Sequence, residues 1–503
     1  MQALTSIHQL SKSFSDSEMR VLIKYLTSFE KIKLVLPKSL LLLDFVRADI
    51  MEVNQLLQEL DVTEDTLRKL AERLLDKMLE TLTLELNVNR LGEYTPQGRA
   101  NIFVRKCILR ASVLPKRGLY QLAINVLKKG IRTARKYELF VPLLEALYLY
   151  YQIYIMLYGD KNPYKIQQEI KKYEKLRLLE IECNMLLNML HNQYGFVSHK
   201  QFNKDKYILE LINKISLYTK NSARMMYYSF TFKQFLLENK GDYTKAINLL
   251  ISFIDFIQEN KIVYKKRDHG VLLLNLSNCY LSYGNYNEAI LSVDEACHFF
   301  DSGGYNYCNA LELKGYIYIY SNQDKEAEKV LNQLLAKTNV TEYLRYVYTF
   351  LLANILFIRK DYKQVLVVLS ESVDLKQDKS GWNFAIRLLL IMTHMEMKLL
   401  KWKDQAMLDF ENLKRYRNRA IEDASIKERC KLIVYLINAI QREGYNYTLV
   451  GEKEKKYIDR LSEIELNLPC VSKSANIILF SQWLNAKINK IDFVPDYSLR
   501  FNK

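Results

Sequence analysis

The sequence predicts an all-α protein in which helices are joined by short connections. At 503 residues the chain exceeds the size at which a single compact core stops growing. It contains only 15 glycines and 7 prolines, whereas ordinary usage is about 7% and about 5%. Sheet proteins need these residues at their turns, and no segment alternates like a half-buried strand between turn residues. These features favour an open array of helices over several compact domains.

A recurring phrase divides the middle of the chain into helical hairpins. Each copy begins with a turn residue and has, five positions later, an apolar anchor that opens an amphipathic helix. The copies occupy residues 118–124, 241–247, 284–290, 322–328, 360–366 and 401–407. The last five anchors, Ala246, Ala289, Ala327, Val365 and Ala406, lie 43, 38, 38 and 41 residues apart. Such a period is typical of stacked helical hairpins.

These copies resemble the tetratricopeptide repeat (TPR) family over roughly residues 96–415, because that family joins its two helices by a Gly-Asp/Asn-Tyr turn. The resemblance implies an α-solenoid and a small residue where the two helices cross, twelve positions before each anchor. Four copies have one: Ala111, Ser277, Gly315 and Ala353. Gln234 and His394 take that place in two degenerate copies.

We expect three regions: an N-terminal helical domain over 1–95, TPR-like repeats over 96–450, and a C-terminal capping helix with an extended tail over 451–503. In the first, Asp61 or Thr63 is predicted to cap a helix with the apolar stripe Leu67, Leu70 and Leu74. Residues 51–74 weakly resemble a helix-turn-helix. However, residues 43–86 hold eleven acids against five bases, which would repel phosphate. A packing or dimerisation unit is therefore favoured over a DNA reader.

No motif in the sequence is typical of catalysis or of cofactor binding. There is no phosphate-binding loop, dinucleotide fingerprint, nucleophile elbow or HExxH pair. The seven cysteines include no CxxC pair, and Cys279, Cys297, His298 and Cys308 lack the close pairing of metal ligands. We therefore expect no enzymatic activity, metal, cofactor or small-molecule substrate. With no apolar signal region and no uncharged run of about 18 residues, we expect a cytoplasmic protein without a membrane span.

The strongest charge signal lies between residues 99 and 136, which hold eleven basic residues and no acidic one, in a chain of net charge +16. Helical spacing places Lys106 with Arg110, and Lys128 with Arg132 and Arg135, on common faces. The basic surface predicted from this segment comprises Arg105, Lys106, Arg110, Lys128, Lys129, Arg132 and Arg135. Either a solvated face or a contact surface for an anionic partner explains it.

The TPR resemblance also implies a groove lined by the first helix of each hairpin. The residues predicted to bind a partner there are Asn278, Glu312, Tyr316, Tyr320, Asn354 and Phe357. Asn278 and Asn354 fall where the family uses amides to hold a peptide backbone, whereas the basic residues that clamp an acidic tail are missing. An apolar or aromatic ligand is implied, and the protein's own termini could equally fill the groove.

Together these features predict a non-enzymatic protein-binding scaffold or adaptor that acts as part of a complex. The alternative is a nucleic-acid- or ribosome-associated regulator that docks through the basic hairpin at residues 99–136.

Overall fold

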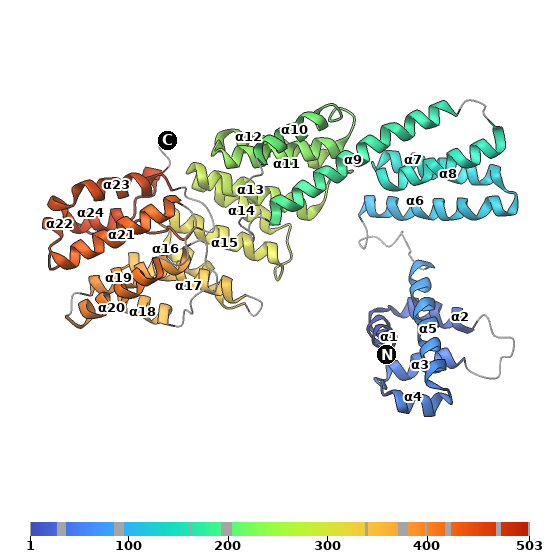
Figure 1. Cartoon of the computed structure of the whole chain (residues 1–503), viewed down its shortest axis with the longest axis horizontal. Coiled ribbons are helices and arrows are strands. Elements are labelled where there is room, and N and C mark those ends of the chain that lie inside the picture. The colour runs from blue at the N-terminus through green and yellow to red at the C-terminus, as the bar shows by residue number, and fades with distance from the viewer. Residues whose placement is uncertain are drawn as a thin grey trace. The chain divides into compact units, whose positions relative to one another are not determined.

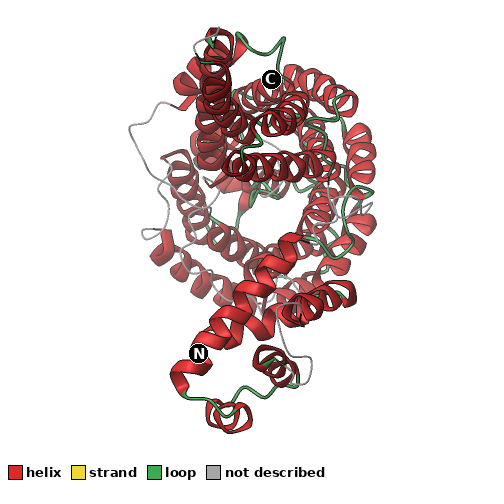
Figure 2. Ribbon diagram, turned by 90° about the vertical axis from the view of Figure 1, so that its right-hand side faces the viewer, coloured by secondary structure: helices red, strands yellow, loops and turns green. Residues whose placement is uncertain are grey.

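The computed structural model describes residues 2–27, 37–84, 95–159, 163–192, 204–337, 341–370, 381–397, 400–417, 424–468 and 474–500. Within these ranges all regular structure is helical (Figure 2), which confirms the all-α prediction. The chain divides into two compact units, Met1–Pro163 and Tyr164–Lys503. The boundary between them lies inside the segment predicted to hold TPR-like repeats.

The first five helices share a core of their own at the start of the first unit. They are α1 (Gln2–Ser13), α2 (Asp16–Thr27), α3 (Lys38–Arg47), α4 (Val53–Leu60) and α5 (Glu64–Leu84). Thr63 caps α5, since the Thr66 N–H donates to its hydroxyl at 3.4 Å. Asp61 instead ends α4 in the left-handed conformation, with φ 47°. Leu67 and Leu74 are buried and Leu70 is half-buried, so the predicted stripe is confirmed.

Three longer helices follow in the first unit: α6 (Pro96–Val113), α7 (Tyr120–Lys136) and α8 (Phe140–Tyr158), with a short 3₁₀ turn at Leu114–Arg117. α6 and α7 cross closely, because a Cβ on Gly130 would lie 3.0 Å from the Cβ of Cys107. α8 packs against both. Among the described residues α8 is also the one helix long and apolar enough to cross a membrane. A single such helix is weak support for a span, since core helices of soluble proteins have the same composition.

In its described residues the second unit holds sixteen helices, α9 to α24, and a terminal 3₁₀ turn (Figure 1). They are α9 (Tyr164–Asn192), α10 (Lys204–Ser216), α11 (Ala223–Asn239), α12 (Tyr243–Glu259), α13 (Lys266–Tyr283), α14 (Tyr286–Cys297), α15 (Tyr305–Tyr320), α16 (Asp324–Leu335), α17 (Glu342–Ile358), α18 (Tyr362–Ser370), α19 (Trp382–Glu396), α20 (Leu400–Arg417), α21 (Ala424–Arg442), α22 (Tyr447–Lys453), α23 (Lys455–Leu466), α24 (Phe480–Ile488) and η2 (Ser498–Arg500). From α10 to α21 each helix packs against the next. In addition, α13 contacts α15, and α17 contacts α19.

The hairpin turns have one common hydrogen-bond pattern. The predicted turn residue has a positive φ in five copies: Gly118 73°, Gly241 70°, Gly284 89°, Asn322 56° and Lys360 66°. The N–H of the following residue returns to a carbonyl five positions back, as from Asn285 to Tyr280 at 2.9 Å. Asn285 also caps the next helix, accepting from the Glu288 N–H at 3.4 Å. Two consecutive residues thus end one helix and start the next.

The twelve-residue spacing does place small residues at helix crossings. Ser277 in α13 donates from its hydroxyl to the carbonyl of the anchor Ala289 in α14 at 2.7 Å, across a fully buried contact. Gly315 in α15 faces Leu331 of α16, whose Cδ2 would be 3.6 Å from an added Cβ. In the two degenerate copies a larger polar side chain, Gln234 or His394, occupies this position instead. The Nδ1 of buried His394 lies 2.9 Å from Asp409 Oδ2 in α20, which accommodates the larger side chain.

Two sequence predictions near the C-terminal end need correction. Lys401, taken as the sixth turn residue, lies inside α20, so the helix begins before the predicted turn. A turn that the phrase did not identify occurs at Gly444 and Tyr445, whose φ values are 60° and 64°. It joins α21 to α22, and Asn446 caps α22. The predicted single capping helix after residue 451 is in fact α23 and α24, followed by a non-helical segment up to Tyr497.

Candidate functional site

The groove residues predicted from the TPR resemblance lie on α13, α15 and α17, and most are buried. Relative exposure is 2% for Glu312, 0% for Tyr316, 1% for Tyr320, 1% for Asn354 and 2% for Phe357. Asn278 is half-buried. Tyr316, Tyr320 and Phe357 belong to one continuous core that extends from α13 to the C-terminal segment. As the structure stands, these side chains do not offer an open surface.

Two of these residues, Asn354 and Glu312, form hydrogen bonds within the protein. The Asn354 side-chain amide donates to the Phe350 carbonyl of its own helix at 2.7 Å, rather than pointing toward a ligand. The Tyr348 hydroxyl donates to Glu312 Oε2 at 3.3 Å, and burial, reinforced by that carboxylate, raises the pKa of Tyr348. Both contacts stabilise the interior of the helical stack.

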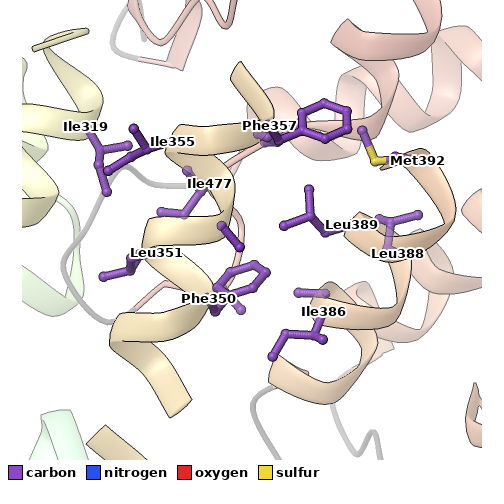
Figure 3. Packing of buried hydrophobic residues seen from close by; sticks show 14 of the residues in the cluster. Ile319, Phe350, Leu351, Ile355, Phe357, Ile386, Leu388, Leu389, Met392 and Ile477 are labelled. Atoms are coloured by element: carbon purple, nitrogen blue, oxygen red, sulfur yellow. The ribbon is translucent and has the colours of Figure 1, made fainter. Parts of the chain in front are cut away.

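The C-terminal segment covers this part of the core. Ile477 lies among side chains of α17 and α19 (Figure 3). Trp483 in α24 is fully buried, and its Nε1 donates to Glu396 Oε1 at 2.7 Å. Lys487, one turn later, forms an ion pair with the same carboxylate. α24 is therefore fixed to the end of α19 by a charged and aromatic contact.

Beyond α24 the chain runs as a non-helical strap whose side chains alternate between buried and exposed positions. We call residues 491–497 the tail strap. Phe493 contacts the Phe357 ring with centroids 6.3 Å apart, and Tyr497 contacts the Tyr320 ring edge-on at 5.0 Å. Pro495 between them is buried. Two predicted groove residues, Tyr320 and Phe357, are thus covered by aromatic side chains of the same chain.

Polar contacts hold the tail strap at both ends. Lys360 Nζ lies 2.7 Å from Asp492 Oδ1, and the lysine holds the pKa of that carboxyl below its usual range. The side-chain amide of Gln482 donates to the Asp496 carbonyl at 2.8 Å and accepts from the Asp496 N–H at 3.2 Å. Lys360 and Gln482 were not among the predicted site residues. Lys360 was noted only as a turn residue, and nothing local singles out Gln482.

A buried ion pair anchors the chain that leads into the tail strap. Arg429 of α21 donates from Nε to Glu465 Oε1 at 2.8 Å and from Nη1 to Asn476 Oδ1 at 2.9 Å. The second oxygen of Glu465 accepts from the Ser481 N–H at 2.8 Å. The Glu465 side chain is 0% exposed and that of Arg429 is 6% exposed. This network connects α21, α23 and the start of α24.

The predicted basic residues form an exposed face on α6 and α7, which we call the basic face. Arg105 and Arg110 of α6 and all four basic residues predicted on α7 are exposed, and Lys106 is half-buried. On α7, the buried positions fall on the opposite side of the helix from Lys128, Lys129, Arg132 and Arg135. The basic residues therefore lie on the exposed side of each helix, as the helical spacing predicts.

Most charges on the basic face have no compensating partner. Within the described part of the chain, Arg105, Arg110, Lys128, Lys129 and Arg132 form no ion pair, whereas Lys106 and Arg135 do make further interactions. Only water and counter-ions screen the repulsion between these charges. The basic face therefore keeps a positive potential that attracts an anionic partner.

Large apolar side chains lie among these charges. On α6, Leu109 is 67% exposed, one turn after Arg105, and Val113 is 45% exposed, one turn after Arg110. Leu122 on α7 is also 49% exposed. The basic face therefore combines positive charge with apolar contact area.

A further candidate is a cavity of about 730 Å³ between α1 and α5. Its lining joins Leu4 and Leu67 to the charged residues Asp65, Arg68 and Glu72. Asp65 forms ion pairs with Lys69 at 2.6 Å and Arg68 at 2.9 Å, and their hydrogen bonds lower the pKa of Asp65. The charges thus largely neutralise one another.

The described residues include no group of three or more His, Cys, Asp and Glu side chains arranged to hold a metal ion. The sequence matches no protein-family model, and no curated protein is significantly similar to it.

Proposed function

We propose that this chain is a non-enzymatic, cytoplasmic scaffold or adaptor that binds a protein partner through the basic face. In this proposal the hairpins stack as a TPR-like α-solenoid. Support comes from the common turn pattern, the twelve-residue spacing of Ser277 and Ala289, and the packing of consecutive helices from α10 to α21. Repeats of this kind present extended surfaces and need no catalytic residues.

The observation that carries the proposal is the mixture of charge and apolar area on the basic face. A phosphate backbone is bound by positive charge and gains little from exposed aliphatic side chains. Protein interfaces, in contrast, bury apolar residues within a polar rim. Leu109 and Val113, exposed among Arg105 and Arg110, fit an acidic protein surface that also offers apolar contacts.

Residues 99–136 hold eleven basic residues and no acidic one, which favours a second candidate, a nucleic-acid- or ribosome-associated regulator. Nonspecific binding to nucleic acid depends on the number of phosphates neutralised, and this segment supplies many charges. The two candidates differ in what the apolar residues contribute, so substitutions can separate them.

Affinity purification of the tagged chain with and without nuclease is the first test. Partners that survive nuclease support the scaffold, and loss of all partners supports the regulator. In a gel-shift assay at low salt, failure of micromolar protein to retard RNA or DNA would exclude the regulator, since an exposed face of this charge binds phosphate nonspecifically.

Two matched variants sharpen the test. Reversing Lys128, Lys129 and Arg132 to glutamate should abolish capture of the partner in either case. Reversing three exposed lysines elsewhere, Lys240, Lys261 and Lys363, changes the net charge equally and should have no effect. Leu109→Ser should weaken a protein partner and leave nucleic-acid binding and its salt dependence unchanged.

A further inference from the structure

We propose that the surface under the tail strap is a peptide-binding site. Its ligand class is an extended segment that carries an acidic residue, an aromatic residue directly after it, proline two positions further on and tyrosine two positions after the proline. In this structure the chain's own Asp492, Phe493, Pro495 and Tyr497 fill the site. A partner segment of the same chemistry would bind by displacing them. This site is separate from the basic face and does not depend on it.

The geometry of the tail strap is that of a bound extended peptide rather than of a core element. Phe493, Pro495 and Tyr497 face the protein, whereas Val494 and Asp496 between them are exposed. This alternation of inward and outward side chains is how an extended chain places every second residue in a pocket. The receptor side supplies an aromatic ring for each end, Phe357 for Phe493 and Tyr320 for Tyr497.

The backbone of the tail strap is held by a side chain, as in peptide recognition. The amide of Gln482 contacts both the N–H and the carbonyl of Asp496. An amide that both donates to and accepts from one residue's backbone recognises the direction of that backbone and not the identity of the side chain. Any extended segment that places a residue at this point could make the same two bonds.

The electrostatic part of the site selects an acidic ligand. Lys360 binds Asp492, and the side chains of the pair are 49% and 82% exposed. An exposed pair contributes little affinity. It does penalise a positive charge at that position, and Lys487 reinforces the preference by also lowering the pKa of Asp492.

The outward side of the tail strap indicates that the segment is replaceable. Ile491 is 64% exposed and Val494 is 69% exposed, so large apolar side chains are left in water. Only three side chains of the strap are inserted, and the helices beneath them belong to a core that continues well beyond the strap. Release of the strap would uncover Tyr320 and Phe357 without removing the helices that position them.

The test uses a fluorescein-labelled peptide of residues 490–500 and the full chain carrying Phe493→Ala and Tyr497→Ala, which undocks the strap without shortening the protein. A chain ending at Lys490 serves as a second receptor. In fluorescence anisotropy both should bind the peptide saturably, and wild type should bind it at least about tenfold more weakly, because its own strap competes. A peptide with Phe493→Ala and Tyr497→Ala should not bind.

A charge exchange tests the placement of the ligand. Lys360→Glu in the undocked receptor should weaken the wild-type peptide about threefold, as expected for an exposed ion pair. A peptide with Asp492→Lys should regain that loss. Lys363→Glu, an exposed lysine nearby in sequence, is the matched control and should change nothing.

Three results would overturn the proposal. One is a folded, undocked receptor, with wild-type circular dichroism and melting temperature, that fails to bind the peptide. Another is equal binding by wild type and the undocked receptor, which would place the peptide elsewhere. The last is loss of folding in both receptors, since the strap would then be an integral part of the core.

Discussion

The two sites predicted from the sequence have opposite relations to solvent. The basic face on α6 and α7 is exposed, and most of its charges have no partner in the described structure. The groove residues on α15 and α17 are covered, with Tyr320 and Phe357 in contact with the tail strap. The basic face was predicted from charge and helical spacing, and the groove residues from the TPR resemblance. Neither prediction considered burial, and the difference in exposure follows from the chemistry of the side chains.

Charged groups are strongly hydrated, and burying them without partners costs far more than leaving them in water. The aromatic side chains of the predicted groove have the opposite preference, since the free energy falls when a covering segment removes apolar area from water. The chain supplies that segment itself in Phe493 and Tyr497. A helical protein can thus leave a cationic surface in water, whereas its aromatic side chains are covered by an extended segment of the same chain.

The largest expected effect concerns the buried ion pair that anchors the C-terminal segment. Arg429→Ala leaves Glu465 buried without a counter-charge and should lower the free energy of unfolding by about 3–5 kcal/mol. Urea unfolding followed by tryptophan fluorescence measures this, because all three tryptophans, at 382, 402 and 483, lie in the second unit. Arg429→Lys keeps the positive charge but loses the planar guanidinium that donates two hydrogen bonds. Its loss in free energy of unfolding should therefore be smaller than that of Arg429→Ala but measurable. A loss below about 1 kcal/mol would show that the pair is not closed off from water.

Next in size is the helix crossing at Gly315. Gly315→Leu forces α15 and α16 apart at Leu331 and should cost about 1–3 kcal/mol in the same unfolding experiment. Gly315→Ala should be neutral or slightly stabilising, since its Cβ would meet Leu331 at an ordinary 3.6 Å. Lys363→Leu on the exposed side of α18 should have no effect. An unchanged unfolding curve for Gly315→Leu would mean that the crossing lies elsewhere.

A smaller, pH-dependent effect is expected at Glu238 of α11. Burial raises the pKa of Glu238, although hydrogen bonds from Gln234 and Cys279 oppose the shift. A raised folded-state pKa means that stability increases as the pH falls through that pKa toward the ordinary value of 4.5, and decreases as the pH rises. Glu238→Gln should therefore stabilise the protein at pH 8 and reduce this pH dependence.

Urea midpoints at pH 8 and pH 5.5 provide the measurement. Glu259→Gln, an exposed glutamate at the end of α12, is the control and should leave both midpoints unchanged. If Glu238→Gln destabilises the protein at pH 8, the ionised carboxylate is a net stabilising group at this position.

The smallest effect on stability is expected on the basic face. Reversing Lys128, Lys129 and Arg132 to glutamate should change the free energy of unfolding by less than about 0.5 kcal/mol, since these exposed side chains form no ion pairs in the described structure. Thermal melts followed by circular dichroism should coincide or shift slightly upward as repulsion is relieved. A clear drop in melting temperature would assign these residues to the fold and not to a partner.

The features that could be predicted from the sequence are those formed by residues close together along the chain. The turn at Gly284, its cap Asn285 and the anchor Ala289 are joined by bonds spanning five residues or fewer, so their pattern can be read from a short window. The crossing of Ser277 with Ala289 spans only twelve residues, within one hairpin. The same is true of the basic face, because both of its helices belong to one hairpin.

The covering of the groove could not be read in this way. Trp483 reaches Glu396 across 87 positions, and Gln482 binds a backbone whose sequence is irrelevant to the contact. The turn at Gly444 and Tyr445 was missed because two successive left-handed residues shift the spacing of the phrase. The TPR resemblance supplied the groove positions, and only the packed chain shows what occupies them.

The order in which the chain is synthesised also determines when the tail strap can cover Tyr320 and Phe357. Hairpins closed by short-range bonds need no distant residues, so each can form as it leaves the ribosome. Residues 491–497 follow α15, α17 and α19 in the sequence, and those helices are therefore complete before the strap emerges. During that interval Tyr320 and Phe357 stand uncovered on a nascent protein. A partner present at that moment would meet the site before its internal competitor exists.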